Sequence, residues 1–221
     1  MTKEVIITVR GEHETRHAPE RATVHLAVRS EHHERADAVA RAHNWAAPVI
    51  DSLQQRENTE GFERWSSSHV TVRAERPWNN EGKRLPVVYT ATVEFTVVFR
   101  DATELSTWIS EVSVRDGITI YSVQWSLTET TREEVEREVA TRSVAVAIVR
   151  AEAYARALGL TTVTAQEIAD TGLLSRNEPR HEPRMMSARA SAVGASTAPQ
   201  FELEPEDIIV SATVEARFIA Q

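Results

Sequence analysis

The sequence contains no cysteine in 221 residues, which excludes disulfide bonds, thiolate nucleophiles and cysteine-based metal sites. Glycine is scarce as well: the chain has seven, and it contains neither a glycine-rich phosphate loop nor a Gly-x-Ser-x-Gly nucleophile motif. Basic residues number 25 against 33 acidic ones, so the formal net charge is −8. This balance argues against general binding to nucleic acids or anionic membranes, because both require a basic surface.

Long apolar runs are missing too, since none approaches the roughly 20 residues that span a bilayer. The opening sequence, MTKEVIITVRGEHE, has no basic region followed by a long apolar stretch. We therefore expect no signal peptide, no membrane insertion and a cytoplasmic location. Hydrophobic residues make up 41% of the chain, which is enough for a substantial core in one large domain or two small ones.

The longest helical pattern covers residues 131–160, and the rest of the chain reads mainly as strands around it. Thr131 and Glu134 have capping-box spacing, and Gly159 fits the left-handed residue after a helix. The apolar stripe predicted for this helix has steps of three and four residues. Its members are Val144, Ile148, Ala151, Ala155 and Leu158. This spacing is typical of a helix that packs against a sheet.

The remaining segments alternate between strand and helix patterns. Strands are predicted at 5–10, 21–30, 69–74, 87–100, 118–127, 163–168 and 207–219, with a polar loop at 11–19. A helix is predicted over 32–55, kinked or divided at Pro48, with a short helix at 102–115. The buried face predicted for 32–55 holds Ala36, Val39, Ala40, His43, Ala47, Ile50 and Leu53. Residues 173–205 contain four prolines and little periodicity, which predicts a mobile loop.

These elements predict an α+β fold in a single domain over 1–221. Strand, helix, strand, strand occurs at 21–100 and again at 118–219, which indicates two βαββ units with mainly antiparallel sheets. In each unit a long helix is expected to pack on one face of the sheet.

Four segments together resemble the SIMPL-domain (YggE-like) family. They are a strand, Gly11 and Ala18-Pro19-Glu20-Arg21-Ala22; the middle strand from Tyr89; the alanine-rich helix ending in Leu158-Gly159-Leu160; and the last strand with Val210-Ser211-Ala212. The resemblance implies a soluble α+β domain of largely unknown function that forms homo-oligomers, including ring or channel-like forms. It also implies a link to stress response, because bacterial members are commonly exported and connected with envelope or oxidative stress. The founding animal member is a signalling adaptor for a pelle-like kinase. The family has no established catalytic residues, so the resemblance assigns none here.

One motif suggests chemistry: His13-Glu14-Thr15-Arg16-His17 matches H-E-x-x-H. In zinc peptidases two histidines one helical turn apart bind the metal, and the glutamate acts as general base. Here the motif falls in a predicted loop before Pro19. Glu34 or His33 could be a third ligand, and nothing in the sequence selects between them. The other candidate cluster, Arg176, Arg180 and Arg184, is interrupted by prolines and diluted by glutamates.

The sequence therefore predicts a non-enzymatic, self-assembling interaction or scaffold protein, with no catalytic, cofactor or metal residues and no nucleic-acid partner. A homo-oligomer is expected to form through an edge strand, either 118–127 or 208–218, and any other protein partner is unidentified. Two alternatives remain. One is a metal-dependent hydrolase that uses His13, Glu14 and His17, and the other is a small-molecule binding protein with a pocket between helices and sheet.

Overall fold

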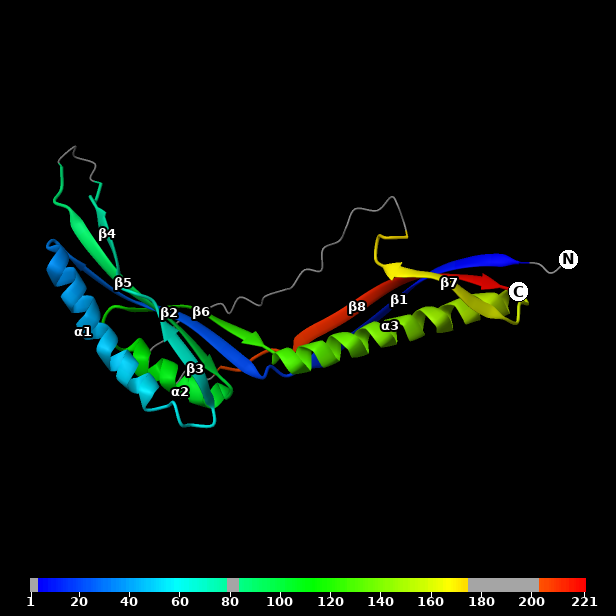
Figure 1. Cartoon of the computed structure of the whole chain (residues 1–221), viewed down its shortest axis with the longest axis horizontal. Coiled ribbons are helices and arrows are strands. Elements are labelled where there is room, and N and C mark those ends of the chain that lie inside the picture. Colours follow the sequence, from blue (N-terminus) through cyan, green and yellow to red (C-terminus); the bar gives the residue numbers. More distant parts are fainter. Residues whose placement is uncertain (1–3, 79–83, 175–202) are drawn as a thin grey trace. The chain divides into compact units, whose positions relative to one another are not determined.

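The computed structural model describes residues 4–78, 84–174 and 203–221, and in these ranges it confirms an α+β fold (Figure 1). Three helices and two antiparallel sheets make up the described chain. The chain divides into two compact units. The loop predicted at 173–205 and the three arginines at 176, 180 and 184 lie largely or wholly outside the described residues.

Unit 2 is the middle part of the chain, Pro19–Ser126 with a short later segment. Its elements are β2 (Arg21–His32), α1 (Arg35–Gln54), β3 (Phe62–Ser67), β4 (Thr71–Glu75), β5 (Val88–Phe99), α2 (Ala102–Ser113) and β6 (Ile118–Ser126). The strand order is β3-β5-β2-β6, and β4 pairs with another part of β5. The strand β3 was not predicted from the sequence.

The core of unit 2 lies between one face of this sheet and the two helices α1 and α2. Alternation along β2 and β5 predicts this face, and Val24, Leu26, Phe95 and Phe99 are almost fully buried there. The apolar positions of α2, Leu105, Trp108, Ile109 and Val112, are buried as well. Trp108 Nε1 donates to Ser52 Oγ at 3.1 Å. Asp101 caps α2, since its side chain accepts from Glu104 N at 2.7 Å.

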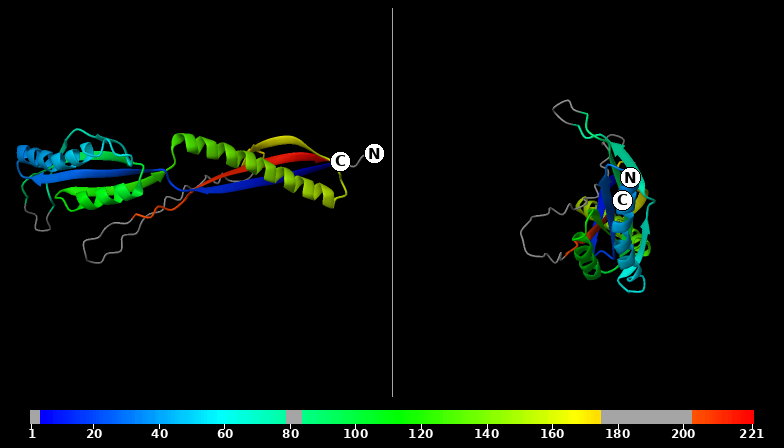
Figure 2. Two further views of the ribbon diagram at one scale, coloured as in Figure 1. Left: turned by 90° about the horizontal axis from the view of Figure 1, so that it is seen from below. Right: turned by 90° about the vertical axis from the view of Figure 1, so that its left-hand side faces the viewer.

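Unit 1 is built from both ends of the chain. It contains β1 (Val5–His17), α3 (Glu129–Ala157), β7 (Val163–Asp170) and β8 (Ile208–Ala220), and the strand order is β1-β8-β7. The helix α3 runs along β1 and β8 and covers one face of the sheet (Figure 2). Its core holds mostly small and β-branched side chains, among them Val9, Ala147, Ala151 and Val214.

The predicted polar loop at 11–19 is wrong for most of its length, because β1 continues to His17 and pairs with β8 along all thirteen residues. Gly11 does not end the strand; it lies inside it, where α3 comes closest. A Cβ at this position would collide with the carbonyl oxygen of Ser143 and lie 2.7 Å from the amide nitrogen of Ala147. Glycine is therefore needed here for close approach of the helix.

The helix α1 turns a different face inward from the predicted one, and the inward face of α3 agrees with the prediction in part. In α1 the buried residues are Ala38, Ala42, Ala46, Val49, Ser52 and Leu53. Of the predicted stripe only Leu53 is buried, and Ala36, Ala40 and His43 are exposed. In α3 Ala151 and Ala155 are buried as predicted, but Ile148 and Leu158 are 39% and 53% exposed. Alanines on several sides of each helix leave the inward face poorly defined by sequence.

The helix ends also differ partly from the prediction. The N-cap of α3 is Thr128, three residues before the predicted cap Thr131. The side chain of Thr128 accepts from Thr131 N at 3.3 Å. Its C-terminal end agrees: Gly159 has φ +74°, Gly159 N donates to Arg156 O and Leu160 N to Ala155 O, which is a Schellman motif. The helix α1 passes through Pro48 without division, since Pro48 lies on its exposed side.

Of the two strands predicted as possible sheet edges, one is an edge and the other is not. The strand β8 is central in unit 1, with β1 and β7 on either side, so it is not an edge. The strand β6 pairs with β2 and is an edge of the sheet in unit 2. The sequence order of the second βαββ pattern, β6-α3-β7-β8, therefore spans both units, and β1 completes the sheet of unit 1.

Candidate functional site

The H-E-x-x-H motif lies on β1, and this excludes the zinc-peptidase arrangement of its side chains. Residues along a strand alternate between its faces, so His13 and His17 share one face and Glu14 lies on the other. At about 3.3 Å per residue, the Cα atoms of the two histidines are roughly 13 Å apart. His17 Nε2 contacts Thr15 Oγ1 at 3.3 Å. A strand therefore does not place the two imidazoles on one metal ion as a single turn of helix does.

The proposed third ligands belong to unit 2 and have ordinary local contacts. His33 Nδ1 lies 3.3 Å from the carbonyl oxygen of Val87, and Glu34 is the N-cap residue of α1. His32 contacts Asp37 at 3.2 Å. Among the described residues, no group of three or more histidine, aspartate or glutamate side chains is arranged to hold a metal ion.

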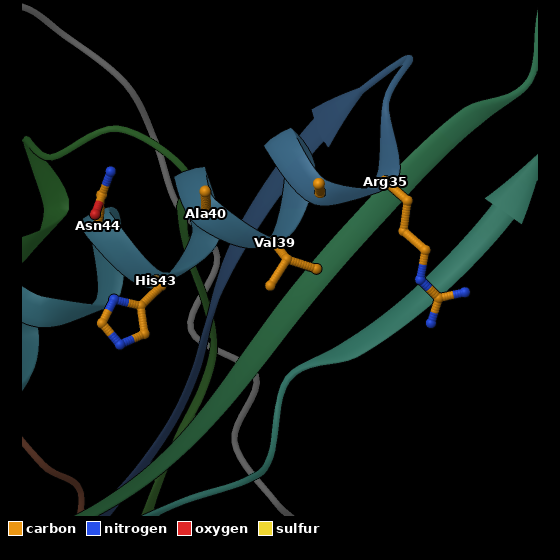
Figure 3. Close-up of a pocket in the computed structure, with 6 residues that line it drawn as sticks. Arg35, Val39, Ala40, His43 and Asn44 are labelled. Carbon is orange, nitrogen blue, oxygen red and sulfur yellow. The ribbon is translucent and has the colours of Figure 1, made fainter.

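A shallow apolar groove follows the outer side of α1 (Figure 3). It is lined by the exposed small residues Ala36 and Ala40, together with Val39, His43, Asn44 and Arg35. These residues belong largely to the stripe that the sequence predicted as core. The groove offers one imidazole and one guanidinium but no carboxylate among its lining residues, so it lacks a paired acid and base.

A second groove lies on the sheet face of unit 1 that α3 leaves uncovered. Its lining includes Arg10, Glu215 and Arg217. Arg10 Nη2 donates to Glu215 Oε1 at 3.2 Å, and Arg217 Nη1 donates to Glu167 Oε2 at 2.6 Å. Both carboxylates are therefore neutralised by neighbouring arginines, and the arrangement joins adjacent strands by ion pairs.

A further charged cluster, which sequence reasoning missed, surrounds Glu63 at the start of β3. The carboxylate is largely buried and lies 2.6 Å from Arg21, 3.4 Å from Arg100 and 3.8 Å from Arg64. These residues come from the ends of three neighbouring strands or the turns beside them. The cluster ties these ends together, and nothing in the spacing of its members along the sequence indicates it.

The edge strand β6 is the most distinctive interaction surface of the described chain. Its residues Ile120, Val123 and Trp125 pack against the core, while Tyr121 is 61% exposed. A bulge places Tyr121 as the extra residue between the pairs His25–Ser122 and Leu26–Ile120. No described strand pairs with the other side of β6, so this edge carries backbone donors and acceptors available to another chain.

Charge distinguishes β6 from the other edges of the two sheets. The strand reads ITIYSVQWS and has no ionisable group except the tyrosine hydroxyl. In contrast, β1, β3, β4 and β7 each contain at least two charged residues, such as Glu167 and Asp170 in β7. Charged side chains discourage pairing with a second chain, so β6 is the edge with the least protection.

Comparison with known protein families agrees with the fold and motif order. The profile of the SIMPL family, described as a protein of unknown function (DUF541), matches residues 7–218. The chain belongs to the SIMPL family. The match covers both units of this SIMPL protein, from β1 to β8, and confirms the resemblance seen in the four sequence segments. A search of curated proteins gave no match. Within the described ranges, this SIMPL protein has no helix long and apolar enough to cross a membrane.

Proposed function

We propose that this SIMPL protein is a non-enzymatic scaffold that assembles with copies of itself through the free edge of β6. The observation that carries the proposal is the absence of charge along β6, an edge that no other described strand covers. Pairing between two such edges would satisfy the backbone groups on both. The described side chains offer interaction surfaces and ion pairs, and none of the grooves brings an acid, a base and a nucleophile together.

The test introduces charge on β6 without disturbing the core. Tyr121 and Gln124 are exposed, so Tyr121→Lys with Gln124→Lys should leave the fold intact. We expect light scattering after size exclusion to give a multiple of 24.7 kDa for the unmodified chain and a smaller mass for the variant. The control is Thr164→Lys on β7, an exposed edge position in the other unit, which should not change the mass.

A monomer at all concentrations of the unmodified chain would contradict the proposal. An unchanged assembly in the β6 variant would show that the chain associates through another surface. Thr213→Lys, which the sequence would suggest for the last strand, is not a suitable test because β8 is central in its sheet.

A further inference from the structure

The hairpin of β4 and β5 carries an exposed, positively charged end, which we call the arm. The arm comprises the described residues 73–78 and 84–88, and β4 and β5 pair up to Glu75 and Val88 (Figure 1). Arg76 Nη1 donates to the carbonyl oxygen of Leu85 at 3.4 Å and so links the two sides. Trp78 is 85% exposed, the most exposed of the large hydrophobic residues described.

Three arginines give the arm its charge. Arg73, Arg76 and Arg84 are exposed, and none forms an ion pair with another described residue. The positive patch is local, because the chain as a whole has a net charge of −8. Tryptophan and arginine are the residues most enriched at energetic hot spots of protein interfaces. The composition of the arm is therefore typical of a surface that binds another protein.

The opposite charge is concentrated at the beginning of α3, on a surface that we call the acidic stripe. Glu129, Glu133 and Glu136 follow each other at steps of four and three residues, so they lie on one side of the helix, and all are exposed. The hydrogen bond from Arg132 to Glu129 and the negative charges of Glu129, Glu136 and Glu133 raise the pKa of Arg132. In the described chain, Glu133 and Glu136 have no ion-pair partner of their own.

We propose that the arm of one copy binds the acidic stripe of a second copy. The proposal rests on the self-assembly proposed above and names a second contact, independent of β6. Arginine forks match carboxylates in bidentate geometry, and Trp78 adds apolar area with little loss of side-chain freedom. Because arm and stripe are different surfaces, the contact either occurs twice in a two-fold dimer or repeats head to tail in a closed ring or an open filament.

An anionic membrane is the competing occupant of the arm. Sequences that bind acidic lipids by charge usually have clusters of four to eight lysines and arginines. The described arm has three arginines, accompanied by Glu75. Its use of arginine also favours carboxylates held by a protein, and a matching group of carboxylates is available on α3.

The experiment exchanges the charges of the two surfaces. The arm variant is Arg76→Glu with Arg84→Glu, and the stripe variant is Glu133→Arg with Glu136→Arg. We expect each alone to weaken self-association by about tenfold or more, because like charges then face each other. An equimolar mixture of the two variants should associate again in sedimentation and light scattering, since the charges are complementary between chains. Higher salt should weaken the contact of the unmodified chain.

Matched controls separate this contact from general charge effects and from β6. Arg16→Glu with Arg35→Glu changes the net charge as the arm variant does, at exposed arginines elsewhere, and should leave association unchanged. If the stripe variant unfolds by circular dichroism, Glu133→Gln with Glu136→Gln should still weaken association. Loss of assembly in the β6 variant with no effect of the arm variant would overturn the arm contact and leave the proposed function standing.

Three further results would overturn the arm contact. One is failure of the mixture to associate when both variants are folded. Another is an effect of the control variant equal to that of the arm variant. The third is unchanged assembly of the arm variant with loss of its binding to phosphatidylserine vesicles, which would assign the arm to membranes. The opposite pattern, with an inert β6 variant and restored association in the mixture, would support the arm and reject the edge.

Discussion

At the scale of single residues, Gly11 determines how closely α3 packs on β1. The helix lies so close that its backbone at Ser143 and Ala147 occupies the space of a side chain at Gly11. The buried helix residues beside it are small, with Ser143 and Ala147 both 0% exposed. Small residues on both elements allow this packing, in which backbone meets backbone with little side chain between.

Gly11→Ala is expected to destabilise the protein by about 1–3 kcal/mol, because the added methyl group overpacks the contact between helix and strand. Denaturant unfolding followed by circular dichroism measures the loss. Glu12→Ala, at the next and exposed position, should change the free energy of unfolding by about 0.5 kcal/mol or less. A gain in stability for Gly11→Ala, as alanine often gives over glycine in a strand, would mean that α3 lies farther from β1.

At the scale of elements, alternation along strands predicts the buried face more accurately than periodicity along helices does. On β5 every second residue from Ala91 to Phe99 is buried, and the residues between them are polar except Val98, which is buried as well. On α1 the sequence has alanines at 36, 38, 40, 42, 46 and 47, so several faces look equally suitable for burial. The predicted face of α1 differs from the buried one by about a third of a turn for this reason.

The edge strand β6 was predicted as a candidate for self-assembly, while the arm and the acidic stripe were not. The net charge of the whole chain does not indicate the arm, because acidic residues elsewhere outnumber its arginines. The pairing partners of β6 and β8 depend on contacts between distant segments, such as Arg21 with Ser126 and Val5 with Ala220. No local pattern specifies such pairs, so sequence alone left the edge undecided between the two strands.

Pro48 offers a test of the uninterrupted helix α1. Pro48→Ala restores a backbone donor for the carbonyl oxygen one turn earlier and should stabilise the protein by about 2 kcal/mol, after allowance for the more flexible unfolded chain. Thermal and denaturant unfolding report the change. Asn44→Ala, one turn away on the same exposed side, is the control and should have little effect. A loss of stability would show that a bend at Pro48 is needed for Val49 and Leu53 to pack.

At the scale of the whole molecule, the middle of the chain has a core of its own. The buried cluster of unit 2 draws its fully buried members from residues between Ala22 and Val112. Outside Pro19–Ser126, its described apolar contact is Leu203, whose amide donates to Ser106 Oγ at 3.3 Å. Unit 2 therefore has nearly all of the hydrophobic core that a separately folding domain needs.

We expect the fragment Pro19–Ser126 to fold alone, with cooperative thermal unfolding and dispersed amide signals in NMR spectra. The matched fragment 127–221 lacks β1, which pairs with β8 along all of its thirteen residues, and is expected to remain unfolded. Adding a peptide of residues 1–18 to the second fragment should restore its structure. An unfolded Pro19–Ser126 fragment would show that the segment around Leu203 is essential to the core.

The pairing of β1 with β8 has a consequence for synthesis on the ribosome. Val5 and its partner Ala220 are separated by 215 positions in the sequence. At about 5–20 residues per second, β1 waits on the order of 10–40 seconds for its partner strand. During that time Ile7 and Val9, which are buried in the finished protein, have no β8 to pack beside. The nascent chain thus carries β1 without its neighbouring strand until β8 has been made, and we expect chaperones to act on β1 during that time.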